Sequence, residues 1–84
     1  MNVEDVLRQA AAQYNGGYAK AALALVVKAL ACKQDSRTYR LAVTYACAAR
    51  DLPTAKRYFV RVPRENQANL EQKCQLEGLD VRAP

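Results

Sequence analysis

The stretch from residue 18 to residue 31, YAKAALALVVKALA, is the feature that most limits how this chain can fold. Its apolar side chains recur at helical spacing in two adjoining rows, which leaves only Lys20 and Lys28 to face water. A helix that is apolar around most of its circumference has to be covered on two sides. In a chain of 84 residues the cover must come from the segments before and after it. We therefore expect a stack of antiparallel helices with residues 18–31 at its centre.

The rest of the chain repeats the helical periodicity, so the expected fold class is all-α with about five helices. Turn and cap residues separate the helices: Asn15-Gly16-Gly17, Asp35-Ser36, Arg50-Asp51-Leu52-Pro53, Pro63 and Gly78. The other helices are expected over residues 3–14, 36–49, 52–62 and 64–77. The fifth is mostly polar, which suits the outer end of a helical stack. We expect one domain over residues 3–79, followed by a flexible tail over residues 80–84.

Charge is distributed unevenly along the chain. The net charge is +5, but residues 28–64 hold nine basic and two acidic residues, a local excess of +7. A basic segment of this kind attracts acidic peptides, nucleic-acid backbones or anionic membrane surfaces, although a merely solvated basic exterior is an equal alternative.

The three cysteines, Cys32, Cys47 and Cys74, are widely spaced, and the chain has no histidine to complete a zinc site. We interpret them as buried thiols in a reducing compartment, with a disulfide or redox role as the less favoured alternative. No metal or cofactor is expected. Acidic residues near the N-terminus replace the basic start of a secretory signal, and the longest apolar run, Ala21–Val27, is too short to span a membrane. The expected location is the cytoplasm.

An internal repeat emerges when the chain is compared with itself in the register that places Gly16 over Arg50. Leu7 then aligns with Leu41, Ala12 with Ala46, Tyr18 with Leu52, Ala21 with Ala55, and Leu25 with Phe59. The spacing is that of tetratricopeptide repeats, which are helical hairpins with a period of about 34 residues.

The residues Tyr14–Ala21 match the "Gly-x-Tyr-x-x-Ala" turn of that family, and over residues 3–62 the chain resembles tetratricopeptide repeat proteins. It departs from them at Arg50, which replaces the turn glycine of the second copy, and at Pro63, which comes early for a third repeat. Residues 55–79 are also similar to the C-terminal ends of bacterial signalling proteins with such repeats, including serine/threonine kinases. The resemblance implies antiparallel hairpins stacked as a short right-handed superhelix.

The resemblance also implies a function, because members of the family hold protein segments on the concave face built by the first helix of each pair. The corresponding peptide-binding residues would be Val3, Val6, Ala10, Gln13 and Tyr14 in the first copy, and Arg37, Arg40, Thr44, Cys47 and Ala48 in the second. Arg37 and Arg40 lie one helical turn apart, so we expect their guanidinium groups to converge on a carboxylate of an acidic or amphipathic peptide. A solvated helix face is the alternative for these two arginines.

The expected function is therefore a non-enzymatic adaptor that binds a protein or peptide partner. One alternative is an oligomerising or chaperone-like helical subunit, because a domain this small buries little surface by itself. Another, less favoured alternative is a nucleic-acid-binding domain, suggested by the basic segment and by Tyr39, Tyr45 and Tyr58. An enzyme is the least favoured class, because the sequence has no histidine, no glycine-rich phosphate loop and no paired catalytic groups.

Overall fold

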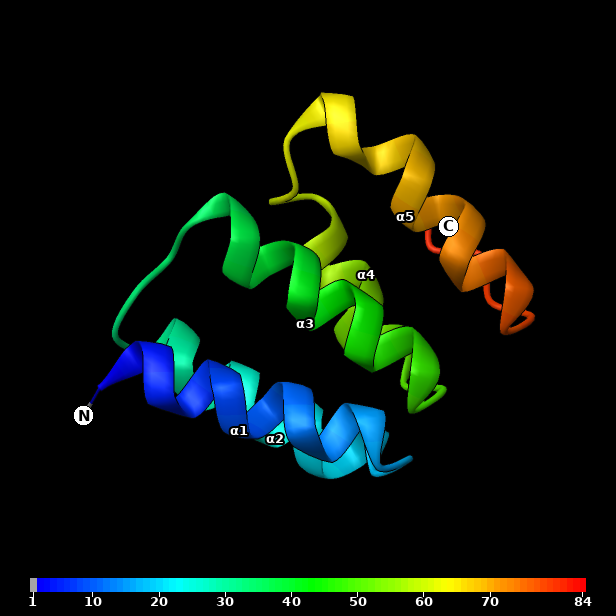
Figure 1. Ribbon diagram of the computed structural model, residues 1–84. Coiled ribbons are helices and arrows are strands. Elements are labelled where there is room, and N and C mark those ends of the chain that lie inside the picture. The colour runs from blue at the N-terminus through cyan, green and yellow to red at the C-terminus, as the bar shows by residue number, and fades with distance from the viewer. Residues whose placement is uncertain (1) are drawn as a thin grey trace.

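The computed structural model describes residues 2–84, and this part of the chain forms five α-helices and no strand (Figure 1). The helices are α1 (Val3–Asn15), α2 (Ala19–Leu30), α3 (Ser36–Ala48), α4 (Leu52–Phe59) and α5 (Arg64–Leu76). The all-α fold class and the number of helices are confirmed. Nearly every predicted helix end lies within one residue of the observed end. The exception is α4, which ends at Phe59 rather than at Val62.

Three helices begin at side chains that cap their first turn. Asn2 accepts a hydrogen bond at 3.3 Å from the backbone N–H three residues further on. Asp35 accepts hydrogen bonds from the backbone N–H and the hydroxyl of Thr38 at 2.9 and 2.7 Å, and Asp51 is bonded in the same way to Thr54. Each cap satisfies an N–H group that has no partner inside the helix. The only two acidic residues of the basic segment, residues 28–64, therefore serve as helix caps.

The two hairpins, α1–α2 and α3–α4, repeat in a register one position shorter than the predicted one. Equivalent caps, left-handed turn residues and buried positions all share this register: Asn2 and Asp35, Gly17 and Arg50, Tyr18 and Asp51, Ala22 and Ala55, Val26 and Phe59. The predicted alignment is wrong, since it pairs exposed Ala21 with fully buried Ala55. The sequence is so rich in alanine and leucine that neighbouring registers match almost equally well. Burial in the folded chain distinguishes them.

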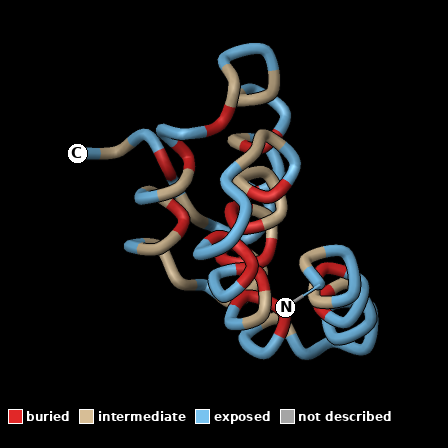
Figure 2. Tube along the Cα trace, turned by 90° about the vertical axis from the view of Figure 1, so that its left-hand side faces the viewer, coloured by how far each residue is buried: buried red, intermediate tan, exposed pale blue. Residues whose placement is uncertain are grey.

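The centre of the molecule is α3, which packs against α2, α4 and α5. It also meets α1, where the rings of Tyr14 and Tyr45 stack with their centroids 4.7 Å apart. Buried residues line the inner sides of the helices, and exposed residues follow their outer sides (Figure 2).

The prediction that residues 18–31 form the covered centre is wrong. On α2, Ala22, Val26 and Ala29 are fully buried, but a second face is open to water, with Val27 38% exposed. The other apolar residues of this open face are Ala21 and Ala24, and exposed Ala31 follows directly at the end of the helix. The expectation failed because a helical wheel treats alanine as apolar, whereas its single methyl group costs little free energy when it is exposed.

The cysteines also differ from the prediction of three buried thiols. Cys47 on α3 and Cys74 on α5 form a buried disulfide, with 1% and 0% of their surfaces exposed and their Cα atoms 5.2 Å apart. Cys32 is exposed. Helical spacing identified the apolar sides of the helices on which Cys47 and Cys74 lie, but the pairing depends on how α5 crosses α3.

The last residues fold back over α4 and α5, although the sequence predicts a flexible tail over residues 80–84. Val81 is 5% exposed and belongs to the core. The guanidinium group of Arg82 lies 5.0 Å from the centre of the Phe59 ring and forms an ion pair with Glu71 at 2.9 Å. Apolar burial, a cation–π contact and an ion pair thus connect this segment to the helices.

Candidate functional site

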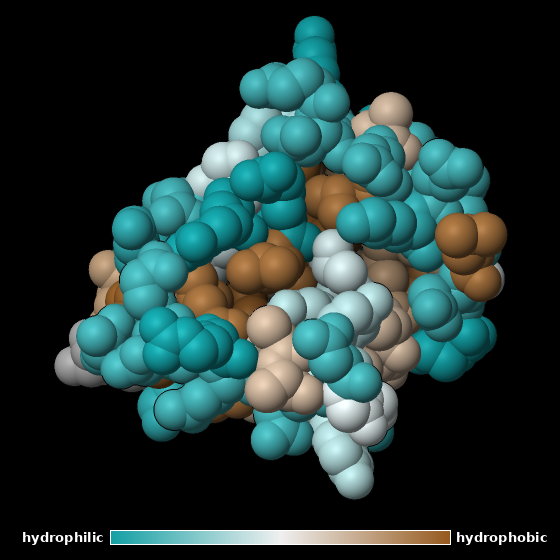
Figure 3. All heavy atoms as spheres, viewed as in Figure 1, coloured by the Kyte–Doolittle hydropathy of each residue, from teal (hydrophilic) through white to brown (hydrophobic). Residues whose placement is uncertain are grey.

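The first helices of the two hairpins, α1 and α3, lie on the same side of the molecule as α5, with α2 and α4 behind them (Figure 1). Two hollows open on this side. We name them the α1–α3 groove and the α3–α5 groove; each has a volume of about 240 Å³. Figure 3, drawn from the same direction, shows apolar patches in the hollowed surface, surrounded by polar residues. This layout combines an apolar floor with polar rims.

The α1–α3 groove is lined by α1 residues one position after most of those predicted. From α1 the lining residues are Glu4, Leu7, Arg8 and Ala11, and from α3 they are Arg37, Leu41 and Tyr45. The observed register of the repeat explains the difference, since it makes Glu4, Leu7 and Ala11 the equivalents of Arg37, Arg40 and Thr44. The structure therefore turns a different side of α1 towards the groove.

Most of the predicted α1 residues lie elsewhere. Val3 and Val6 are half-buried against the core, and Ala10 is fully buried, with 0% of its surface exposed. Gln13 is exposed but does not line either groove. Tyr14 is 38% exposed and borders a third, smaller hollow at the end of α3 and α5.

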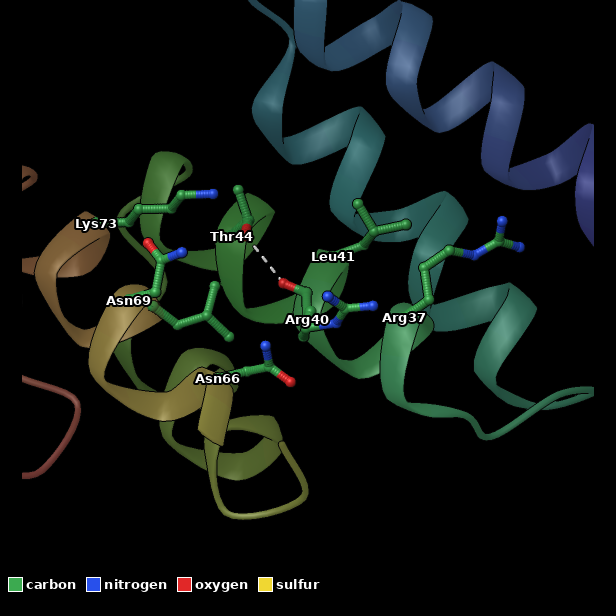
Figure 4. A pocket seen from close by; sticks show the side chains of 8 residues that line it. Arg37, Arg40, Leu41, Thr44, Asn66, Asn69 and Lys73 are labelled. Carbon is green, nitrogen blue, oxygen red and sulfur yellow. Dashed lines mark hydrogen bonds between the residues drawn. The ribbon is translucent and has the colours of Figure 1, made fainter. Parts of the chain in front are cut away.

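The predicted α3 residues Arg37, Arg40 and Thr44 all line the α3–α5 groove, and of the three only Arg37 also lines the α1–α3 groove. Arg37 and Arg40 do not converge. Arg37 extends towards α1 and forms an ion pair with Glu4, whereas Arg40 lies on the side of α5 and its Nε donates to the Ser36 carbonyl at 3.3 Å (Figure 4).

The ion pair between Glu4 and Arg37 changes the electrostatics of the rim shared by the two grooves. The hydrogen bond and the positive charge of Arg37 lower the pKa of the Glu4 carboxyl, and the same contact raises the pKa of Arg37. Both groups are therefore charged at neutral pH and largely compensate each other. The cation that remains available on α3 is Arg40, which has no ion-pair partner within residues 2–84.

The α3–α5 groove has hydrogen-bond donors on its walls and an apolar floor. Leu70, which is 4% exposed, and half-buried Leu41 form the floor. Asn66, Asn69 and Lys73 line the α5 side (Figure 4). Among the described residues, no carboxylate lines this groove, so Arg40 and Lys73 give it a positive charge.

The sequence analysis does not predict the contribution of α5 to this groove, because a mostly polar terminal helix suits the outer end of a helical stack. A signal was present: residues 66, 69, 70 and 73 follow the i, i+3, i+4, i+7 spacing, which places two amides, a leucine and a lysine on one face. Spacing alone does not predict which helix this face of α5 packs against.

Comparisons of the chain with protein-family models, with curated proteins and with solved structures find no match. Residues 2–84 contain no cluster of three or more histidine, cysteine or acidic side chains suited to holding a metal ion. Within the same residues, no helix has the length and apolar character that a membrane crossing would need. The site therefore has to be interpreted from its own residues.

Proposed function

We propose that this chain is a non-enzymatic adaptor whose α3–α5 groove binds an acidic segment of a protein partner. The observation that carries the proposal is the set of donors in the groove. Arg40 and Lys73 stand on opposite walls without ion-pair partners within residues 2–84, above the apolar floor of Leu41 and Leu70.

These groups suit different parts of a peptide. A carboxylate side chain would meet Arg40 or Lys73, and charge-assisted hydrogen bonds are stronger than neutral ones. Asn66 and Asn69 lie one turn apart on α5, and each side-chain amide can both donate to and accept from a peptide backbone. An apolar side chain would contact Leu70. Together these contacts favour an extended segment in which acidic and apolar residues alternate.

The tetratricopeptide resemblance supports an adaptor role, because that family binds protein segments with the first helix of each hairpin, to which α3 corresponds. The observed repeat is one position shorter than the family's period, and α5 follows the second hairpin more closely than a regular third repeat would. The proposal therefore rests on the donors of the groove and does not require membership of the family.

The test is a binding measurement with a ten-residue fluorescent peptide of alternating glutamate and leucine, and a matched peptide with glutamine in place of glutamate. Arg40→Ala and Lys73→Ala should each weaken binding of the acidic peptide about tenfold, the loss expected for a well-placed charge contact. Arg64→Ala is the control, because Arg64 is exposed on α5 and lies outside the groove.

Equal binding of the two peptides, or equal loss in Arg64→Ala, would contradict the proposal. Steep salt dependence with tight binding of single-stranded oligonucleotides would instead support a nucleic-acid-binding role.

A self-associating subunit is the second candidate function. Leu76 is 82% exposed and borders the third hollow together with Tyr14, while Tyr18 and Val60 are 65% and 72% exposed. Adjoining exposed apolar side chains, such as Leu76 and Tyr14, favour association with another surface, whereas isolated ones such as Tyr18 and Val60 do not. Sedimentation at two concentrations, for the wild type and Leu76→Gln, would show whether a larger species depends on this residue.

The cytoplasmic location expected from the sequence depended on reduced thiols. We propose instead a compartment in which disulfides persist, because Cys47 and Cys74 are paired and buried. Differential alkylation of the protein from its source cells, followed by mass spectrometry, tests this location. Free thiols at both positions would contradict it.

A further inference from the structure

A fourth hollow lies where the end of α2, the following loop, the start of α3 and the end of α4 meet. We call it the α2–α4 hollow. Its volume is about 420 Å³, larger than either groove, and the proposed function gives it no role. It shares no lining residue with the α3–α5 groove.

One part of the α2–α4 hollow is apolar and aromatic. Leu30 is 5% exposed and Val27 is 38% exposed, so the first supplies a fixed wall and the second an accessible surface. The rings of Tyr39 and Tyr58 are half-buried, with centroids 6.2 Å apart and planes tilted by 34°. These side chains are already packed, so a ligand would not have to order them.

The other part is cationic. Arg57 lies in the last turn of α4 and Arg61 in the turn that directly follows, and both line the hollow. Neither has an ion-pair partner within residues 2–84. Gln34 adds an amide, and no described residue of the lining is acidic.

Glu65 and Asp51 are the acids nearest to these arginines in the sequence, and neither forms an ion pair with them. The acid next to Gln34 does not compensate them either. Asp35 follows Gln34, but its carboxylate accepts two hydrogen bonds from Thr38 and lies 3.7 Å from the ammonium group of Lys33. Those contacts lower the pKa of Asp35 and leave the carboxylate engaged at the start of α3. The charge of Arg57 and Arg61 is therefore available to a ligand.

We propose that the α2–α4 hollow binds an amphiphilic organic anion, with its anionic group on Arg57 and Arg61 and its apolar body against Val27, Leu30 and Tyr39. Planar guanidinium groups match both carboxylate and phosphate oxygens. The volume falls within the range of small-molecule sites, which combine apolar walls with a few polar groups. The chemistry is shared by two sources, an aliphatic carboxylate and the phosphate of an aromatic nucleotide.

Four probes separate these sources: octanoate and its neutral counterpart octanol, and AMP and its neutral counterpart adenosine. Binding is followed by the NMR chemical shifts of the full chain and by calorimetry. We expect octanoate or AMP to perturb the amide signals of residues 27–31, 34, 39 and 57–61. The neutral counterpart should bind at least about tenfold more weakly, because a charge-assisted pair is lost.

The decisive variant is the double substitution Arg57→Gln and Arg61→Gln, which keeps hydrogen-bonding groups but removes both charges. Both side chains are exposed, so the variant should retain the melting temperature of the wild type. It should bind the anion at least about tenfold more weakly. The matched control, Arg40→Gln with Lys73→Gln, removes two charges from the α3–α5 groove and should bind the anion as the wild type does.

A second substitution tests the apolar part. Val27→Trp fills the accessible side of the hollow and should also block the anion, without removing charge. The proposal is overturned if neither anion binds, if octanol or adenosine binds as well as its charged counterpart, or if the Arg57 and Arg61 double variant keeps full affinity. Loss of anion binding in the control pair would also overturn it.

Discussion

Cys47 on α3 and Cys74 on α5 form a disulfide that crosses 27 residues of sequence, with their Cα atoms 5.2 Å apart. The bond matters because α5 buries only two of its own residues, Leu70 and Cys74. Packing alone gives α5 little apolar area against α3. The disulfide therefore fixes the helix that supplies one wall of the α3–α5 groove.

Replacing both cysteines, Cys47→Ala with Cys74→Ala, should lower the free energy of unfolding by about 3 kcal/mol, because the unfolded chain gains the freedom of a 27-residue loop. Urea denaturation measures this. Cys32→Ala, on an exposed residue, is the control and should cost less than about 0.5 kcal/mol. A dithiol reductant should destabilise the wild type in the same way and leave the double variant unchanged. Equal stability of wild type and double variant would show that packing alone holds α5.

Val81 in the C-terminal segment and Val60 at the end of α4 provide a matched pair of valines. Val81 is 5% exposed and Val60 is 72% exposed. Val81→Ala should lower the free energy of unfolding by about 1–2 kcal/mol, since it removes two methyl groups from the core, whereas Val60→Ala should change it by less than about 0.5 kcal/mol. Thermal melts of the two variants provide the comparison. Similar melting temperatures for both would mean that the segment over residues 80–84 is detached in solution, as the sequence predicts.

Asp35 should make the free energy of unfolding depend on pH in the acidic range. Asp35→Ala should cost about 1 kcal/mol at pH 7, a usual value for a lost N-cap. The hydrogen bonds from Thr38 lower the pKa of Asp35 below its ordinary value of 3.8. The carboxylate therefore stabilises the fold above that pH, and its contribution disappears as the pH falls through the folded pKa.

Denaturation of the wild type and the Asp35→Ala variant between pH 7 and pH 2 tests this, and the difference between them should shrink below about pH 4. Gln34→Ala, at the neighbouring exposed position and without a titratable group, is the control. A difference that stays constant down to pH 2 would mean that the charge of Asp35 contributes nothing.

The ion pair with Glu4 holds the guanidinium group of Arg37 at the rim of the proposed peptide site. Its contact lowers the pKa of Glu4, so NMR titration should find the pKa of the Glu4 carboxyl below its ordinary value of 4.5 and returning towards it in Arg37→Ala. Glu4→Gln should also strengthen binding of the acidic peptide about threefold, because Arg37 becomes available and a negative charge is lost. Asp5→Asn, which removes a charge from the same helix, is the control. Equal gains in both variants would indicate a general charge effect without a role for Arg37.

Several features of the fold could be predicted because their causes are local. Asp35 and Asp51 can cap a helix wherever it packs, and Pro63 interrupts one in any context. The helix ends were consequently close to those observed. The turn at Arg50 was also recognised, although Arg50 occupies the left-handed region, with a φ of 59°, where Gly17 stands in the first hairpin.

The candidate site could be predicted only in part. Arg40 and Thr44 were identified on the correct helix, but Asn66, Asn69 and Lys73 were not, because the partner wall comes from a helix whose crossing with α3 has no local signal. The same is true of the Arg37 ion pair with Glu4, which joins residues 33 positions apart.

The sequence by itself determined that this chain is helical, where its helices begin, and that the middle of the chain is basic, because these properties depend on neighbouring residues. Tertiary structure alone decided the register in which the hairpins repeat, that α3 rather than α2 is central, and that Cys47 meets Cys74. The physical reason is that alanine-rich helices can pack through several faces with similar burial. The face that is chosen depends on all the contacts made at once, among them a disulfide and an ion pair between helices that are distant in sequence.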